Sequence, residues 1–182
     1  DLHVKESSAA SDVYKRQVLC EFAKKFGPEP GNGNAVISMG SLGSGVLHAN
    51  SDLDLIIIYD ADGNDQSEGE RSLSARQYYS RVAKAFITAI SAPMTEGRLY
   101  EIDMRLRPSG FQGPVATSWN SFKNYQKNEA WIWEHLALTR ARAVAGTGSL
   151  LNDFESFRSS LLKSYDRENI FNELVNMRSR IA

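Results

Sequence analysis

The chain has 182 residues, which suits one domain with a sizeable hydrophobic core. Its composition, 42% hydrophobic and 24% charged, is ordinary for a soluble globular protein, and its formal net charge of -1 gives no broad basic field for nucleic acid. A single cysteine excludes an internal disulfide and a cysteine-based zinc site. With no apolar run of membrane-spanning length and no visible signal peptide, we expect a cytoplasmic protein that binds neither membrane nor nucleic acid.

The first 17 residues fit poorly with the rest of the chain. Residues 1–17 show no convincing hydrophobic period, and residues 11–17 resemble translated sequencing-adaptor sequence, so we expect a non-native or disordered leader. The alternative is a genuine helix that is capped at Ser11 or Asp12. Apolar residues then follow a helical spacing from 18 to 26, and a loop rich in Gly, Pro and Asn ends this helix.

The most informative stretch, residues 36–59, predicts a strand, a glycine-rich turn and a second strand. Apolar residues at 36–39 lead into three glycines, which let the backbone turn tightly and approach a ligand closely. Successive amides in such a turn can form a concavity for phosphate oxygens. The residues that we expect to bind nucleotide in this turn are Gly40, Ser41, Gly43, Ser44 and Gly45.

The second strand opens with two aspartates. Asp52 and Asp54 are two residues apart, so both carboxylates project from the same face of the strand. The residues that alternate with them and face a core are Leu53, Leu55, Ile57 and Tyr59. A phosphate-binding turn beside two carboxylates predicts a site for a metal-bound nucleotide.

A third carboxylate is expected from residues 97–107, which alternate between apolar and charged side chains as a strand with one buried face does. If this strand pairs beside the strand that carries Asp52 and Asp54, Asp103 lies next to these two aspartates. Glu101 is on the same face and is an alternative partner for the two aspartates.

Three carboxylates in this arrangement predict a magnesium site. Hard Mg²⁺ ions prefer oxygen ligands, and two such ions can clamp the attacking and leaving oxygens of an in-line displacement. We therefore expect Asp52, Asp54 and Asp103 to be the catalytic residues and the metal ligands. On the same face, Arg105 and Arg107 are expected to donate to nucleotide phosphate.

Several helices follow or separate these elements. Residues 74–92 have the spacing of an amphipathic helix, and Ser118 is placed to cap a further helix. A longer helix is expected over residues 128–145, where Glu134 and His135 lack a second histidine at helical spacing and so favour packing over zinc binding. Two more helices are expected, one with apolar residues from 150 to 161 and one from 170 to 177.

An Asp-x-Asp pair or a glycine-rich turn is weak by itself, since the first often marks a solvated strand end and the second a hairpin. Their combination with a later aspartate-bearing strand resembles the active site of the polymerase-β-like nucleotidyltransferase superfamily. The resemblance implies an α+β fold with a small mixed sheet flanked by helices and followed by C-terminal helices. It places the nucleotidyltransferase core at residues 18–118 and the start of a truncated helical bundle at residues 119–182.

Longer motifs resemble the bacterial glutamine synthetase adenylyltransferase family, whose members carry two related nucleotidyltransferase domains. The similar segments are Gly40-Ser-Leu-Gly-Ser-Gly, Ser51-Asp-Leu-Asp-Leu-Ile, residues 97–110 and residues 125–142. The last two segments look more like the C-terminal, adenylylating copy than the N-terminal, deadenylylating one. Ser41 stands where the family often has Lys or Arg.

The resemblance implies Mg²⁺-dependent transfer of AMP from ATP to a tyrosine of glutamine synthetase, in the regulation of nitrogen assimilation. It also implies a PII-type nitrogen-signalling protein as a partner of the full-length enzyme. The alternatives are the adenylyl-removing, phosphorolytic copy and a nucleotidyltransferase that modifies a small molecule. A catalytically idle module is a further alternative, against which the intact aspartates argue.

Overall fold

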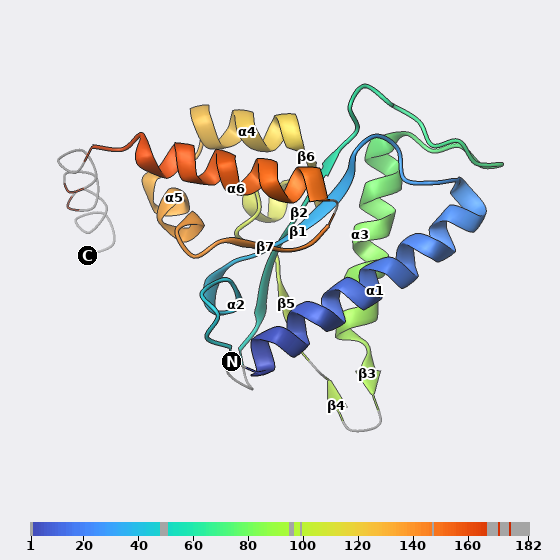
Figure 1. Ribbon diagram of the computed structural model, residues 1–182, viewed down its shortest axis with the longest axis horizontal. Helices are drawn as coiled ribbons and strands as arrows, with labels where there is room; N and C mark the ends of the chain where they lie inside the picture. The colour runs from blue at the N-terminus through green and yellow to red at the C-terminus, as the bar shows by residue number, and fades with distance from the viewer. Residues whose placement is uncertain are drawn as a thin grey trace.

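The computed structural model describes residues 2–47, 51–94, 97–98, 100–146 and 148–166, together with residues 171 and 175. A small sheet forms its centre, in the strand order β5-β2-β1-β7, with β6 also paired to β2 (Figure 1). The strands are β1 (Gly33–Ser38), β2 (Leu53–Asp60), β5 (Ile102–Asp103), β6 (Ala116–Ser118) and β7 (Arg142–Gly146). Because β2 is antiparallel to β1 and parallel to β5 and β6, the predicted mixed sheet of an α+β fold is confirmed.

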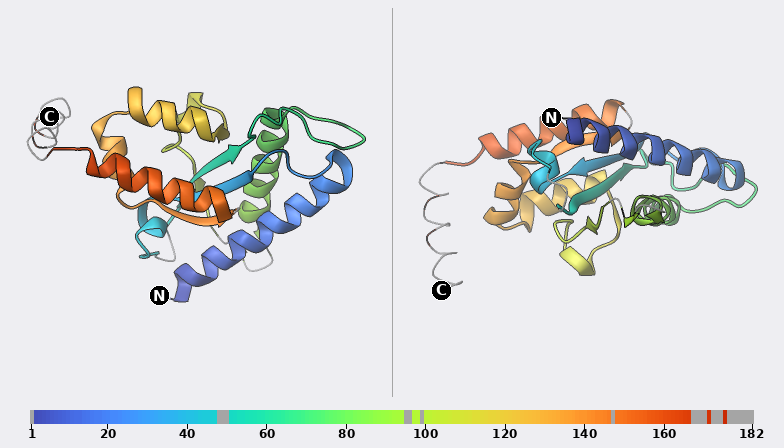
Figure 2. Two further views of the ribbon diagram at one scale, coloured as in Figure 1. Left: turned by 45° about the horizontal axis from the view of Figure 1, so that its top comes forward. Right: turned by 90° about the horizontal axis from the view of Figure 1, so that it is seen from below.

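Helices cover both faces of this sheet (Figures 1 and 2). On one face, α1 (Leu2–Phe26) and α3 (Ala75–Ser91) share a hydrophobic cluster with Val36 of β1. On the other face, α4 (Trp119–Asn128) and α6 (Gly148–Lys163) share a second cluster with Ile37. Since successive strand residues point to opposite faces, the two central strands are buried on both sides.

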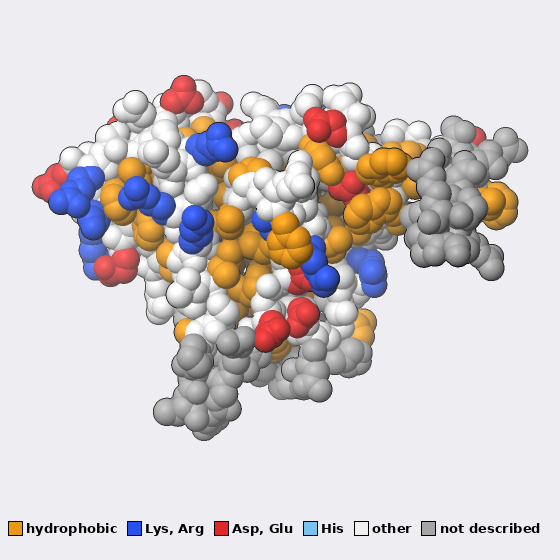
Figure 3. Space-filling view, turned by 180° about the vertical axis from the view of Figure 1, so that it is seen from behind, with side chains coloured by type: hydrophobic (Ala, Val, Ile, Leu, Met, Phe, Trp, Pro, Cys, Tyr) orange, Lys and Arg blue, Asp and Glu red, His pale blue; other side chains and the backbone are white. Residues whose placement is uncertain are grey.

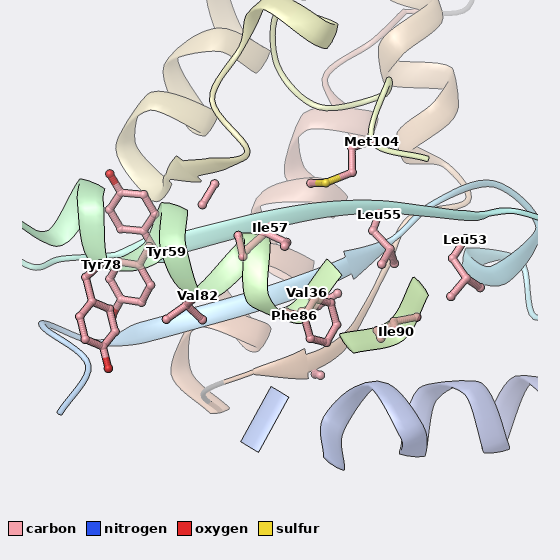
Figure 4. Packing of buried hydrophobic residues seen from close by; sticks show 14 of the residues in the cluster. Val36, Leu53, Leu55, Ile57, Tyr59, Tyr78, Val82, Phe86, Ile90 and Met104 are labelled. Carbon is pink, nitrogen blue, oxygen red and sulfur yellow. The ribbon is translucent and has the colours of Figure 1, made fainter. Parts of the chain in front are cut away.

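The predicted core face of β2 is confirmed. Leu53, Leu55, Ile57 and Tyr59 all belong to the first cluster, where they meet the apolar stripe of α3 (Figure 4). The alternate residues Ile56 and Ile58 are also fully buried and join the second cluster. A strand buried on both faces is rigid, and it fixes the direction in which a side chain at its first residues projects.

The predicted helices before and after β2 are also present. The helix expected over residues 74–92 is α3, and the Ser74 side chain caps it by accepting a hydrogen bond from the amide of Gln77. The helix expected over residues 18–26 is the end of α1, which runs back to Leu2 without a break at Ser11 or Asp12. Residues 2–17 are therefore helical in this structure, and their non-native origin stays a prediction.

The prediction of one continuous strand over residues 97–107 is wrong. The segment contains β4 (Gly97–Arg98), which pairs with β3 (Pro93–Met94), and only two residues of β5. The Asp103 side chain ends β5, because its Oδ1 accepts a hydrogen bond from the amide of Arg105 at 2.8 Å. Aspartate commonly bonds the backbone two residues on in this way and turns the chain, which the alternating pattern does not reveal.

The prediction of one helix over residues 128–145 is also wrong. The segment forms a short helix, α5 (Ile132–Leu138), and then β7, which pairs antiparallel with β1. Ala143 and Ala145 of β7 lie opposite Ile37 and Val36. Pairing with β1 satisfies the backbone hydrogen bonds of both strands, which outweighs the helical preference of alanine.

The remaining elements complete the described part of the chain. They are α2 (Gly40–Gly43), directly after β1, and a short 3₁₀ helix at Gly110–Gln112. The apolar spacing from 150 to 161 is confirmed by α6, whereas the helix predicted from 170 to 177 falls mostly outside the described residues. No helix in these described ranges has both the length and the apolar character needed to cross a membrane.

Candidate functional site

The glycine-rich turn brings the end of β1 against the start of β2. After β1, the amide of Met39 donates to the carbonyl of Asp54 at 2.8 Å, and Gly40 then turns the chain with a φ of +52°. A Cβ at Gly40 would lie 2.1 Å from Oδ2 of Asp54. Glycine at position 40 thus leaves room for this carboxylate against the turn and adopts a φ that other residues rarely do.

The turn is also held from β7, an element that the sequence pattern did not predict. A Cβ at Gly43 would lie 1.9 Å from the carbonyl oxygen of Arg140. Arg142 donates from its guanidinium to the carbonyl of Leu42, and the Ser38 hydroxyl donates to the carbonyl of Arg142. The segment that supports one side of the turn was therefore not predictable from the sequence pattern.

The other residues predicted in the turn play different parts. Ser44 donates its hydroxyl to the carbonyl of Gly40 at 2.9 Å, which closes the short helix α2. Gly45 has a φ of +76°, and no atom of the described residues lies within 4 Å of a Cβ built there. Ser41 is half-buried, and its carbonyl accepts a hydrogen bond from the amide of Val46. Whether these residues contact phosphate stays a prediction.

The predicted carboxylates come together at the start of β2. Asp54 and Asp103 are register partners on the adjacent parallel strands β2 and β5, so the register selects Asp103 rather than Glu101 as the neighbour of Asp54. Asp52 is exposed and immediately precedes β2. Partial burial raises the pKa of the Asp54 carboxyl, and repulsion from Asp103 and Asp52 raises it further. The three carboxylates are thus close enough to interact electrostatically.

Arg105 neutralises one of these carboxylates. Its Nε donates to Oδ2 of Asp103 at 2.6 Å, Nη2 forms an ion pair with the same oxygen, and its backbone amide bonds Oδ1. These hydrogen bonds lower the pKa of the Asp103 carboxyl despite its partial burial. The arginine side chain itself is 65% exposed, so it can swing away without disturbing the core.

Arg107 has a different environment from the one predicted. It is buried, and its guanidinium donates to the carbonyls of Met104, Phe111 and Gly113. These contacts hold the loop after β5 in shape, so they favour a structural role for Arg107. Both arginines act on the charge of Asp103, but among the described contacts only those of Arg105 bond its carboxylate directly.

The carboxylates fit a hard divalent cation in chemistry. All three supply oxygen ligands, and the missing Cβ of Gly40 leaves Asp54 close to the amides of the turn. Within the described ranges, however, no three Asp, Glu, His or Cys side chains are arranged to hold a metal ion as they stand. Each oxygen of Asp103 also accepts a hydrogen bond from Arg105.

The loop after Arg107 lines a hollow near the far end of β2. Pro108, Ser109 and Pro114 line a hollow of about 640 Å³, together with Tyr59 at the far end of β2 and Tyr125 of α4. Tyr59 lies five positions along the strand from Asp54, which corresponds to about 16 Å. This hollow is therefore separate from the carboxylates.

Glu134 and His135 pack inside the protein, as expected. Glu134 accepts a hydrogen bond from the hydroxyl of Tyr125 at 2.9 Å, and His135 Nε2 lies 2.8 Å from the carbonyl of Gln126. Tyr165 contacts the other ring nitrogen of His135, and burial lowers the pKa of this imidazole. These residues join α4 to α5 and the end of α6, away from the carboxylates.

The mixed sheet, the glycine turn and the carboxylates at the start of β2 define a domain of the polymerase-β-like nucleotidyltransferase class. Residues 7–157 match the family model described as glutamate-ammonia ligase adenylyltransferase. The chain belongs to this family.

Three relatives share the name bifunctional glutamine synthetase adenylyltransferase/adenylyl-removing enzyme. The protein of Agrobacterium fabrum is 48% identical over 166 residues, which is 90% of this chain and 17% of the relative. That of Rhizobium meliloti is 46% identical over the same shares, and that of Brucella suis is 52% identical over 71% of this chain and 13% of the relative. The chain thus spans less than a fifth of the length of these relatives.

Hydrophobic side chains also reach the surface of this short chain (Figure 3). Large exposed ones include Phe111 in the 3₁₀ helix, and Trp131 and Trp133 at the start of α5.

Proposed function

We propose that this chain carries the active site that transfers AMP from ATP to a tyrosine of glutamine synthetase. The observation that carries the proposal is the register that sets Asp54 beside Asp103, next to a glycine turn that only glycine can form. The names of the relatives support adenylylation of glutamine synthetase as the reaction. The tyrosine target, the magnesium dependence and the PII-type partner of the full-length enzyme belong to this proposal.

In this proposal, Asp52, Asp54 and Asp103 hold Mg²⁺, and the amides of the turn from Gly40 to Gly45 bind phosphate oxygens. When bound, the metal supplies positive charge that offsets the charge developing on the phosphates. The tyrosine oxygen attacks the α-phosphorus, a new P–O bond forms, and the bond to the bridging oxygen breaks so that pyrophosphate leaves. Positioning and charge neutralisation provide most of the rate enhancement in such transfers.

The hydroxyl proton must leave the tyrosine during the attack. Asp103 is one candidate to accept it. Its lowered pKa makes it a weak base while Arg105 stays bonded to both carboxylate oxygens. Asp54, whose pKa is raised, lies beside it on the neighbouring strand. No histidine or cysteine nucleophile is required, so we expect no covalent intermediate on the enzyme.

The direction of the reaction is proposed from the segment at residues 125–142, which resembles the adenylylating copy of the family. In this structure Tyr125, Glu134 and His135 of the segment pack inside the protein, so these three residues support the proposed direction only as markers of the family. Both copies are expected to share the carboxylates. The adenylyl-removing reaction is therefore the second candidate, with phosphate in place of pyrophosphate beside the metal.

We expect the chain to label unmodified glutamine synthetase when it is given Mg²⁺ and ATP labelled in the α-phosphate. The matched reaction contains adenylylated glutamine synthetase and inorganic phosphate, and it is assayed for ADP. Labelled protein in the first mixture, with little ADP in the second, supports the adenylylating assignment. ADP from the second mixture without labelling in the first would assign the chain to the adenylyl-removing copy instead.

A further inference from the structure

The contacts of Asp103 raise a question about how the metal site assembles. Asp103 lies beside Asp54 on adjacent strands, yet both of its oxygens bond Arg105. The carboxylate is only 14% exposed, whereas the arginine side chain is 65% exposed. The mobile partner of the pair is therefore the arginine, and the fixed partner is the aspartate.

The Arg105 guanidinium and a metal ion compete for Oδ2 of Asp103. A divalent cation at Asp103 needs a lone pair that faces the other aspartates. The guanidinium bonds Oδ2 through Nε and Nη2, so it opposes the cation by occupying that oxygen and by repelling positive charge, while the backbone amide of Arg105 bonds Oδ1. An incoming nucleotide changes this balance, because its phosphates offer the same fork of donors a more highly charged partner. The nucleotide and the metal should then assemble together.

We propose that Arg105 keeps Asp103 out of the metal site until a nucleotide phosphate takes the guanidinium. Resting on the proposed function, this inference adds an order of events at the same site. Before nucleotide binds, the metal site has two available carboxylates, Asp52 and Asp54. Once the phosphates have drawn Arg105 away, Asp103 becomes the third ligand, so that the charge pair works as a switch coupled to the substrate.

The first test measures Mn²⁺ binding without nucleotide, by electron paramagnetic resonance of the free ion. Arg105→Ala should tighten Mn²⁺ binding by about fivefold, the upper range for a partly exposed ion pair. Arg140→Ala is the matched control, because the charge of Arg140 also acts on Asp54 but no described contact joins it to Asp103. If both variants gained the same affinity for Mn²⁺, the cause would be the loss of a positive charge near the site and not the release of Asp103. That result would overturn the proposal.

A double variant locates the effect at Asp103. In an Asp103→Asn background, Arg105→Ala should change the affinity for Mn²⁺ by less than about twofold, because the carboxylate that it frees is gone. A gain of about fivefold that persists in this background would show that Arg105 acts elsewhere. Circular dichroism of each variant checks that folding is unchanged.

The second test measures nucleotide binding without metal, with the analogue α,β-methylene-ATP in the presence of EDTA. Asp103→Asn releases Arg105 for the phosphates, so it should bind the analogue about fivefold more tightly than Asp54→Asn does. Both variants remove one negative charge from the site, and only the first releases the guanidinium. Equal affinities would contradict the exchange of partners.

These experiments measure the binding of Mn²⁺ and of nucleotide, and they do not measure adenylyl transfer. If adenylyl transfer occurs but Arg105→Ala binds Mn²⁺ no better than Arg140→Ala, only the order of events is wrong. If the binding differences appear but glutamine synthetase is not labelled, the switch is present and the proposed reaction is wrong.

Discussion

Replacing Asp54 with asparagine should lower adenylyl transfer to glutamine synthetase by about a hundredfold or more, comparable to the loss of a main electrostatic stabiliser. The substitution keeps the shape of the side chain and removes the charge that a hard cation requires. Initial rates of label transfer from ATP in Mg²⁺ measure the effect. Asp153→Asn, at an exposed position on α6, is the matched control and should retain the parental rate.

The same variant should be more stable than the parent at neutral pH. Burial, Asp103 and Asp52 all disfavour the charged form of Asp54, so its pKa in the folded chain lies above its ordinary value of 3.8. Above that ordinary value the folded state carries a penalty that asparagine removes, and below it the carboxyl is protonated in both states. Asp54→Asn should therefore raise the free energy of unfolding at pH 7 and change it little near pH 3.

Urea unfolding at the two pH values, without metal, measures this difference. A loss of both activity and stability would indicate that Asp54 has a structural role, whereas a loss of activity with a gain in stability is typical of a functional carboxylate held in an unfavourable place. Full activity in the variant would remove Asp54 from the proposed metal site.

The strand β2 and the site at its start were predictable because the local pattern and the tertiary environment agree. Alternation from Leu53 to Tyr59 sets one face toward the core, and the same parity sets Asp52 and Asp54 on the other face. The glycine at position 40 was predictable for a similar reason. Its positive φ and its contact with Asp54 are conditions that a turn between two paired strands imposes.

The segment from 97 to 107 could not be predicted from its alternation, because one side-chain hydrogen bond overrides the pattern. Once Asp103 bonds the amide of Arg105, the chain turns, and Arg107 points toward loop carbonyls instead of the phosphate site. Apolar and charged residues do alternate in this segment, but the segment does not form one extended strand, so the charged side chains do not share one face.

The strand β7 could not be predicted because its residues carry little local preference for a strand. Ala143 and Ala145 favour a helix in isolation, and their place in the sheet depends on the free edge of β1, more than a hundred residues earlier in the chain. Because the sequence pattern did not predict β7, it could not predict the environment of Gly43 either. The sequence indicated a glycine that approaches a ligand, whereas the structure shows one that approaches the backbone before β7.

Gly43→Ala should therefore destabilise the fold by about 3 kcal/mol, the upper part of the range for overpacking a well-packed site. The new Cβ would lie 1.9 Å from the carbonyl oxygen of Arg140 and 2.8 Å from that of Ser38, and neither backbone atom can rotate away. Lower entropy of the unfolded chain offsets at most about 1 kcal/mol of this cost.

Gly45→Ala, in the same turn, separates this packing effect from backbone strain. Gly45 has a φ of +76°, so alanine there costs about 1 kcal/mol of strain, but its Cβ would have no neighbour within 4 Å among the residues that the structure describes. Urea unfolding should thus show a loss about 2 kcal/mol larger for Gly43→Ala than for Gly45→Ala. Equal losses would mean that the contact with Arg140 does not hold the turn. The larger loss at Gly43 would show that the backbone of Arg140, just before β7, supports the turn from outside, so the conformation of the turn depends on a segment far away in the sequence.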